Sequence, residues 1–212
     1  MPIDRLSSKE LYTIRLSKIV GTPTAQKHIQ KLLNVHTLPW KNIYSLIRST
    51  SIDSYSRMFQ YKCLNSILFL NLPLFRMGLC STPLCSFCQS ENETISHLFC
   101  FCPVAKSLWR DLQQFFAVKI NIPDLDLQSA VVGFLGDHIS DIIFVNNILL
   151  MFKITLYRNR DKGSVTLRNV ISNLKTREII EKNIAGSNDN KLSYHSHKWR
   201  IFHDTLDSAP VG

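Results

Sequence analysis

The chain has 212 residues, 45% hydrophobic and 19% charged, which is the composition of a globular domain and excludes a disordered or linker-rich protein. Its formal net charge of +9 allows two interpretations: a surface that attracts polyanions such as nucleic acid, or an ordinary solvated basic surface. The charge is uneven, with eleven Lys or Arg against three acidic residues in 1–76, and eight against three in 153–182.

Residues 1–51 are expected to form an N-terminal basic segment of two or three amphipathic helices, broken at Gly21 to Pro23 and again at Pro39. Within it, apolar residues at helical spacing predict a buried stripe from Trp40 to Ile47.

Residues 52–118 are expected to form a long helix followed by a cysteine-rich segment. Asp53 is a suitable N-cap, and the three-four rhythm of apolar residues extends the helix to Leu70, with Cys63 in the core. Pro103 suits the first turn of the helix that follows the cysteines.

Residues 119–204 are expected to form a C-terminal helical region, with 205–212 as a disordered tail. Its helices are predicted near 126–134, 139–158, 165–184 and 192–202. The longest apolar run, 142–157, is too short for a bilayer, which needs about 20 residues, so no membrane association is expected.

The polar N-terminus carries no secretory signal pattern, so we expect a nuclear or cytoplasmic protein that is not secreted. Thiols stay reduced in these compartments, and clustered cysteines there indicate a metal site before a disulfide.

Four metal-ligand residues stand at the spacing C-x2-C-x8-H-x4-C: Cys85, Cys88, His97 and Cys102. A Cys3His set in a tetrahedron is a standard structural zinc site, and its closed coordination leaves no position for catalysis. The alternative is a group of buried thiols with a core histidine. This alternative is less favourable because two pairs of ligand residues, one pair in each half of the motif, both stand at metal-binding spacing. The sequence therefore predicts one structural Zn²⁺ in a mainly α fold, a helical domain with an embedded Cys3His zinc knuckle.

The fourth ligand is not settled by spacing alone. Cys100 lies three residues after His97, on the same face of a helix, and Cys80 is a more distant candidate. Thr94 is the expected N-cap of the helix that carries His97.

Several motifs resemble the zinc-binding domain near the C-terminus of LINE-type (non-LTR) retrotransposon reverse transcriptases. They are Phe59-Gln-Tyr-Lys-Cys-Leu-Asn65, Leu72-Pro-Leu-Phe-Arg-Met-Gly-Leu79, Pro83-Leu-Cys-Ser-Phe-Cys88, Glu91-x-Glu93-Thr-Ile-x-His-Leu-Phe99, Cys102 and Leu108-Trp109. The resemblance covers about 55–110, more loosely the flanks, and favours Cys102 over Cys100 as ligand. It implies a domain beside a polymerase and thumb, helping to hold template RNA or target DNA.

Reverse transcriptases carry an aromatic-x-Asp-Asp turn that binds the catalytic metal, and this chain has no adjacent Asp pair. We therefore expect no enzyme activity from this chain, which would be a C-terminal piece of an RNA-directed DNA polymerase or a decayed remnant. A metal-dependent nuclease site beginning at Asp124 is disfavoured, because neither Asp137 nor Asp141 is followed two residues later by Lys, and Asp161 and Lys162 are adjacent, which is the wrong spacing.

Basic and aromatic residues near the knuckle are the candidate contacts to RNA or DNA: Arg57, Tyr61, Lys62, Arg76, Lys106 and Arg110. Tyr61 could equally be a core residue. A weaker aromatic-basic cluster stands at Tyr157, Arg158 and Arg160. A zinc-stabilised protein-interaction domain without a nucleic-acid role is the alternative function.

Overall fold

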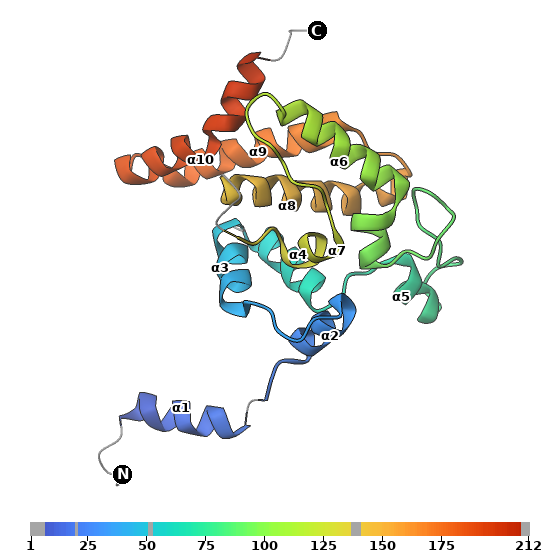
Figure 1. Ribbon diagram of the computed structural model, residues 1–212, viewed down its shortest axis with the longest axis vertical. Helices are drawn as coiled ribbons and strands as arrows, with labels where there is room; N and C mark the ends of the chain where they lie inside the picture. Colours follow the sequence, from blue (N-terminus) through green and yellow to red (C-terminus); the bar gives the residue numbers. More distant parts are fainter. Residues whose placement is uncertain (1–6, 20, 51–52, 137–140, 209–212) are drawn as a thin grey trace. The chain divides into compact units, whose positions relative to one another are not determined.

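The structure, a computed structural model, describes residues 7–19, 21–50, 53–136 and 141–208. The chain forms two compact units, Met1–Leu38 and Pro39–Gly212. The first unit contains α1 (Ser8–Ile19) and α2 (Thr24–Leu33), as Figure 1 shows.

The second unit contains the other helices and the cysteine-rich segment. Its elements in chain order are α3 (Trp40–Thr50), α4 (Ser54–Leu64), α5 (Asn71–Arg76), η2 (His97–Phe101), α6 (Pro103–Phe116), α7 (Leu127–Val132), α8 (Ile142–Arg158), η3 (Arg160–Lys162), α9 (Leu167–Ala185) and α10 (Asp189–Ser208). The described residues include no strand, only an isolated antiparallel bridge between Leu84 and Asn92. The mainly helical class expected from the sequence is confirmed.

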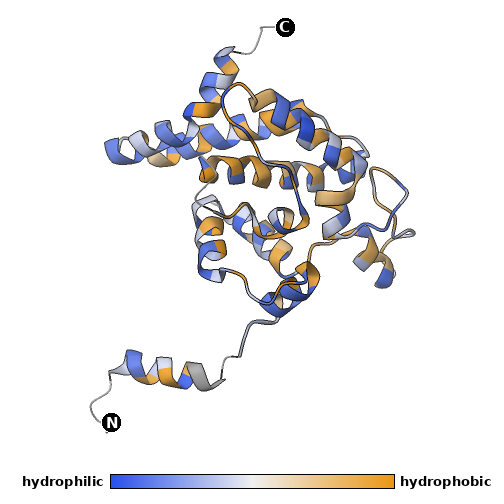
Figure 2. Cartoon of the chain, in the orientation of Figure 1, coloured by the Kyte–Doolittle hydropathy of each residue, from blue (hydrophilic) through white to orange (hydrophobic). Residues whose placement is uncertain are grey.

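Helix α8 is the centre of the second unit. It lies between α3 and the pair α9 and α10 (Figure 1), and every residue from Phe144 to Leu156 is buried. Figure 2 shows it hydrophobic along most of its length. A helix that is apolar on all sides must be surrounded by protein, so its neighbours are arranged around it.

The cysteine-rich segment shares this core. Leu98 and Phe99 are fully buried in the same hydrophobic cluster as α8, and the Phe99 ring packs edge-on against Phe59 of α4 at 6.2 Å. Packing against the helices therefore holds this segment in addition to any contribution from a metal.

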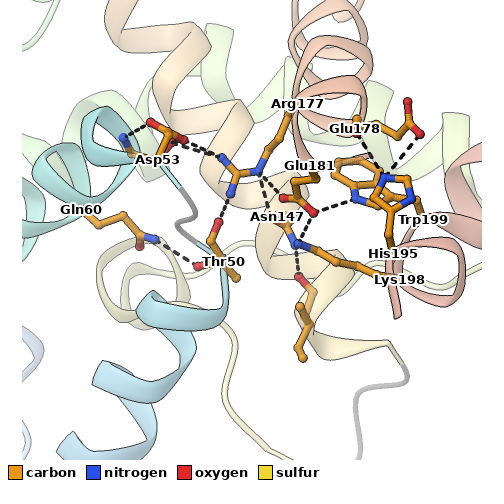
Figure 3. Close-up of polar contacts among 12 residues, drawn as sticks. Thr50, Asp53, Gln60, Asn147, Arg177, Glu178, Glu181, His195, Lys198 and Trp199 are labelled. Carbon is orange, nitrogen blue, oxygen red and sulfur yellow. Dashed lines mark hydrogen bonds and ion pairs between the residues drawn. The ribbon is translucent and has the colours of Figure 1, made fainter. Parts of the chain in front are cut away.

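A buried polar network joins five helices around Arg177 of α9 (Figure 3). The Arg177 guanidinium donates to the Thr50 carbonyl at the end of α3, to the Asp53 carboxylate that caps α4, and to the Asn147 side chain of α8. One turn later on α9, Glu181 lies 3.2 Å from Arg177 Nε and accepts hydrogen bonds from Lys198 Nζ and Trp199 Nε1 of α10. Removing one partner would leave a buried charge, which costs about 3–5 kcal/mol.

The long helix expected up to Leu70 ends earlier than the sequence indicated. α4 stops at Leu64, and Ser66 adopts a left-handed backbone (φ 55°) while its N–H bonds to the Cys63 carbonyl. A separate helix, α5, begins at Asn71. The apolar residues between the two helices keep helical spacing in the sequence, but tertiary packing interrupts the helix there. The expected cap Asp53 and the buried Cys63 are confirmed.

The C-terminal helix is longer than expected. α10 begins at Asp189, before the predicted start near 192, and continues to Ser208, so 205–208 are helical rather than disordered. Residues 209–212 of the expected tail lie outside the described residues. The segment boundaries at 51, 118 and 204 stay predictions. Within the described ranges, no helix combines the length and apolar character that crossing a membrane requires.

Replacing Lys153 by Met should stabilise the protein at neutral and acidic pH. Its ammonium is buried in α8, where it donates to the Ala130 carbonyl (3.1 Å), and burial lowers the pKa of Lys153 from its ordinary 10.5. Because the unfolded chain binds this proton more readily, the folded state is penalised below its lowered pKa and the penalty vanishes as pH rises toward 10.5.

Urea unfolding of zinc-saturated Lys153→Met and wild type at several pH values would measure this difference. The variant's advantage should be largest at low pH and shrink as the pH rises, while the exposed Lys175→Met serves as a control. A difference between Lys153→Met and wild type that stays constant with pH would contradict the expectation.

Candidate metal centre

The cysteine-rich segment begins as a short hairpin. The N–H of Cys85 bonds to the Glu91 carbonyl (2.8 Å), and the N–H of Glu93 bonds to the Pro83 carbonyl (2.8 Å). These bonds hold Cys85 at the base of the turn and bring the chain back toward the helix that carries His97.

The C-x2-C turn directs backbone N–H groups at a cysteine sulfur. The N–H groups of Phe87 and Cys88 bond to the Cys85 side chain, and the N–H of Gln89 bonds to the Cys85 carbonyl (3.0 Å). Gln89 completes the turn with a left-handed backbone, φ 55°. These two donors favour the thiolate form of Cys85, the form that binds metal, but the hydrogen bond with Cys102 and burial outweigh them and raise the pKa of Cys85.

A wide turn of helix carries the second half-site. Thr94 caps it as expected, accepting the N–H of His97 at 3.1 Å, and the N–H of Cys102 bonds to the His97 carbonyl five residues earlier at 2.7 Å. In an α-helix, residues five apart are rotated by about 140° from each other. The π-type turn His97–Phe101 removes that offset and brings His97 and Cys102 to one side.

The four ligand atoms of Cys85, Cys88, His97 and Cys102 all lie within 4.8 Å of one another. The Cys85 and Cys102 sulfurs are 3.9 Å apart, and Cys88 Sγ lies 3.2 Å from His97 Nε2. A zinc tetrahedron with Zn–S bonds of about 2.3 Å has sulfur–sulfur edges of about 3.8 Å. The group is therefore close enough to hold one metal ion, and all four positions of a tetrahedron would be filled by protein.

The position of Cys102 favours its thiolate. The hydrogen bond from Cys85 lowers the pKa of Cys102 to about 7, against the effect of burial and with help from the Ala105 and Val104 N–H groups of α6. The same hydrogen bond raises the pKa of Cys85, which keeps the proton of the pair. A thiolate at a helix N-terminus is a good metal ligand.

The other two candidate cysteines lie outside this group. Cys100 is buried with its sulfur 3.9 Å from the Leu125 carbonyl, and burial raises its pKa. Cys80 donates to the carbonyls of Asn71 and Thr82. The π-type turn is the physical reason that Cys102, rather than Cys100, faces the other three side chains.

A buried carboxylate behind the knuckle, that of Glu93, was not singled out as a site residue by sequence reasoning. It accepts the N–H of Ser86 in the C-x2-C turn (2.9 Å), the N–H of Asn71 at the start of α5 (3.0 Å) and the Arg160 guanidinium (2.6 Å). Burial opposes ionisation, but the bonds from Ser86, Arg160 and Asn71 outweigh it and hold the pKa of Glu93 below 4.5. Its position in the motif Glu91-x-Glu93 was the only signal in the sequence.

The expected nucleic-acid residues are distributed over three helices. Arg57 and Tyr61 are exposed on α4, with Tyr61 56% exposed and so not a core residue. Lys62 is half-buried, its Nζ 5.5 Å from the centre of the Phe69 ring.

The three candidates that bracket the cysteines in sequence are all exposed. Arg76 ends α5, and Lys106 and Arg110 lie on α6. The last two are four residues apart and therefore share a helix face.

The arginine side chains of the second aromatic-basic cluster, near the end of α8, make contacts within the protein. Arg160 is engaged by Glu93, by the Phe69 carbonyl (2.8 Å) and by the Tyr157 ring (4.4 Å from its centre), and Arg158 bonds to the Tyr55 hydroxyl. These groups hold the knuckle and α4 against the end of α8.

Asp124, the residue considered for a nuclease, is exposed and accepts a hydrogen bond from Gln113 (3.0 Å). It is not part of the Cys3His group, the cluster among the described residues that could hold a metal ion.

Comparison with known proteins agrees with this geometry. Residues 26–109, less than half of the chain, match the family model for zinc-binding in reverse transcriptase, and this stretch contains all four residues of the Cys3His group. No curated protein and no solved structure matches the chain. The matched family is a zinc-binding domain and not a catalytic polymerase domain. The findings support a metal-binding module of the reverse-transcriptase type, and the family implies zinc.

Zinc content should separate the two candidate fourth ligands. We expect one zinc per chain in reduced wild type, a loss of stoichiometric zinc in Cys102→Ser, and full zinc in Cys100→Ser, because only Cys102 faces the other ligands. Metal analysis after gel filtration measures this. Zinc lost from Cys100→Ser but kept in Cys102→Ser would overturn the assignment.

Glu93→Gln should weaken zinc binding without touching a ligand. Removing the charge leaves Arg160 without its carboxylate partner and weakens the hydrogen bond that the Ser86 N–H donates. Changes in such outer groups typically cost about 10–100-fold in metal affinity. Competition with a chelating dye measures the affinity. The exposed Glu91→Gln is the matched control and should bind zinc as wild type does; equal affinities for all three proteins would rule out this role for Glu93.

Proposed function

We propose that this chain is the zinc-binding, nucleic-acid-binding C-terminal module of a non-LTR retrotransposon reverse transcriptase, which helps to hold template RNA or target DNA. The observation that carries the proposal is the Cys3His group, assembled within the stretch that matches the reverse-transcriptase zinc-binding family. The motifs around it, from Phe59 to Trp109, support the non-LTR subtype by resemblance.

The metal in this proposal is one structural Zn²⁺, held by Cys85, Cys88, His97 and Cys102. A closed set of four ligands fixes the turn and leaves no position for a reacting water. Polymerase chemistry would belong to a domain outside this chain, since no adjacent Asp pair is present here.

Exposed positive charge supports a nucleic-acid partner. Arg76, Lys106 and Arg110 reach solvent from the helices on either side of the cysteines in sequence, and the chain carries a net charge of +9. Lysine and arginine that neutralise phosphates release counterions, which provides affinity independent of base sequence. Arg57, Tyr61 and Lys62 on α4 would extend this contact.

A protein-interaction role is the second candidate, and a specific observation favours it. The segment between α4 and the cysteines exposes several large apolar side chains: Ile67, Phe69, Phe75, Met77 and Leu79. Such side chains would pack well against a neighbouring polymerase or thumb domain. This role can coexist with nucleic-acid binding, and the parent polymerase is the partner we propose for it.

The salt dependence of binding tests the proposed nucleic-acid role. Affinity of the zinc-loaded chain for single-stranded RNA and DNA, measured by fluorescence anisotropy, should fall linearly with salt on logarithmic axes. The double variant Lys106→Met/Arg110→Met removes two phosphate contacts and should lower the slope by roughly 1.4 on a single strand.

Lys191→Met, an exposed position on α10, is the control and should leave the slope unchanged. Two results would rule out the nucleic-acid role and leave the protein-interaction candidate. One is that zinc-loaded wild type does not bind at low salt, and the other is that its affinity does not change with salt.

A further inference from the structure

An open cavity of about 480 Å³ lies directly beside the candidate metal centre. Two of the proposed ligands, Cys88 and His97, form part of its wall, and Phe101 forms another part. Glu91, Asn92 and Ser96 add hydrogen-bonding groups to the lining. The cavity therefore combines an aromatic face with a polar wall, on a turn that a metal would hold rigid.

Phe101 is exposed although its neighbours in the same turn are not. It is 50% exposed, whereas Leu98, Phe99 and Cys100 are buried in the core. The π-type turn, which aligns His97 with Cys102, also directs this ring out to the cavity, where no packing within the described part of the chain buries it.

A positive charge accompanies the ring. Lys106 Nζ, from the first turns of α6, lies 5.8 Å from the centre of the Phe101 ring. An exposed aromatic ring next to a lysine provides both surfaces that single-stranded nucleic acid uses, a stacking face for the base and a charge for the phosphate.

We propose that this cavity binds one unpaired base of a single-stranded nucleic acid, stacked on Phe101, with the adjoining phosphate at Lys106. The base edge then faces Glu91, Asn92 and Ser96, whose oxygen and amide groups can pair with its N–H and carbonyl groups. The carboxylate of Glu91 repels phosphate and so keeps the backbone on the Lys106 side. This inference rests on the proposed nucleic-acid function and locates one contact within it.

Oligonucleotides with and without bases separate stacking from charge. The zinc-loaded full chain would be titrated with a single-stranded oligonucleotide and with an abasic phosphodiester of the same length and charge. Wild type should prefer the base-bearing strand at least about fivefold, the lower end expected for one stacked base. Phe101→Ala should lose this preference and keep its affinity for the abasic strand, while Phe101→Trp should retain the preference.

Phe69→Ala is the matched control. Phe69 is 52% exposed, has Lys62 Nζ at 5.5 Å from its ring centre, and is not among the residues that line this cavity. It should therefore bind both strands as wild type does. Zinc content of each variant verifies that the knuckle has formed.

Two results would overturn the cavity assignment while leaving nucleic-acid binding intact. One is equal affinity of wild type for the two strands. The other is a base preference that survives Phe101→Ala but disappears in Phe69→Ala, which would move the contact to the segment between α4 and α5. Failure of wild type to bind either strand would instead remove the proposed function, and this contact with it.

Discussion

The buried carboxylate of Glu93 connects the cysteine-rich turn to the helices through hydrogen bonds and an ion pair. It is fully buried and accepts hydrogen bonds from the Ser86 N–H, between the first two proposed ligands, from the Asn71 N–H at the start of α5, and from Arg160 at the start of η3. A buried charge of this kind is tolerable only when all its partners are in place, because desolvation is costly and removal of one partner leaves the others unpaired. The position of the metal-binding turn on the helical body is thereby fixed by electrostatics as well as by apolar packing.

The π-type turn from His97 to Phe101 has two consequences for the proposed function. It brings His97 and Cys102 to the same side, which completes the Cys3His group, and it sends Leu98 and Phe99 into the core while leaving Phe101 outside. One additional residue in a single helical turn thus determines both the ligand set and the exposed ring. π-type turns are rare and are often found at functional sites, which agrees with this double use.

Net charge alone overstates the basic surface of this protein. Lys153 and Arg177 lie in the second basic stretch of the sequence but are buried, and Arg160 is largely enclosed by Glu93 and Tyr157. These three groups hold helices together, so the stretch at 153–182 offers less to a polyanion than its composition suggests. The exposed side chains near the cysteines are therefore the better candidates for contact with a polyanion: Arg76, Lys106 and Arg110.

The sequence by itself determined the local features of this protein. The spacing of Cys85, Cys88 and His97, the caps Asp53 and Thr94, and Pro103 in the first turn of α6 depend on residues close together in the chain, so pattern was sufficient. Only the tertiary structure decided the end of α4 at Leu64, the burial of Arg177, and the choice between Cys100 and Cys102 by geometry. Each of these features depends on partners distant in sequence or on one extra residue in a helical turn. The sequence could not predict them, because the spacing of apolar residues is the same whether a helix continues, breaks or widens.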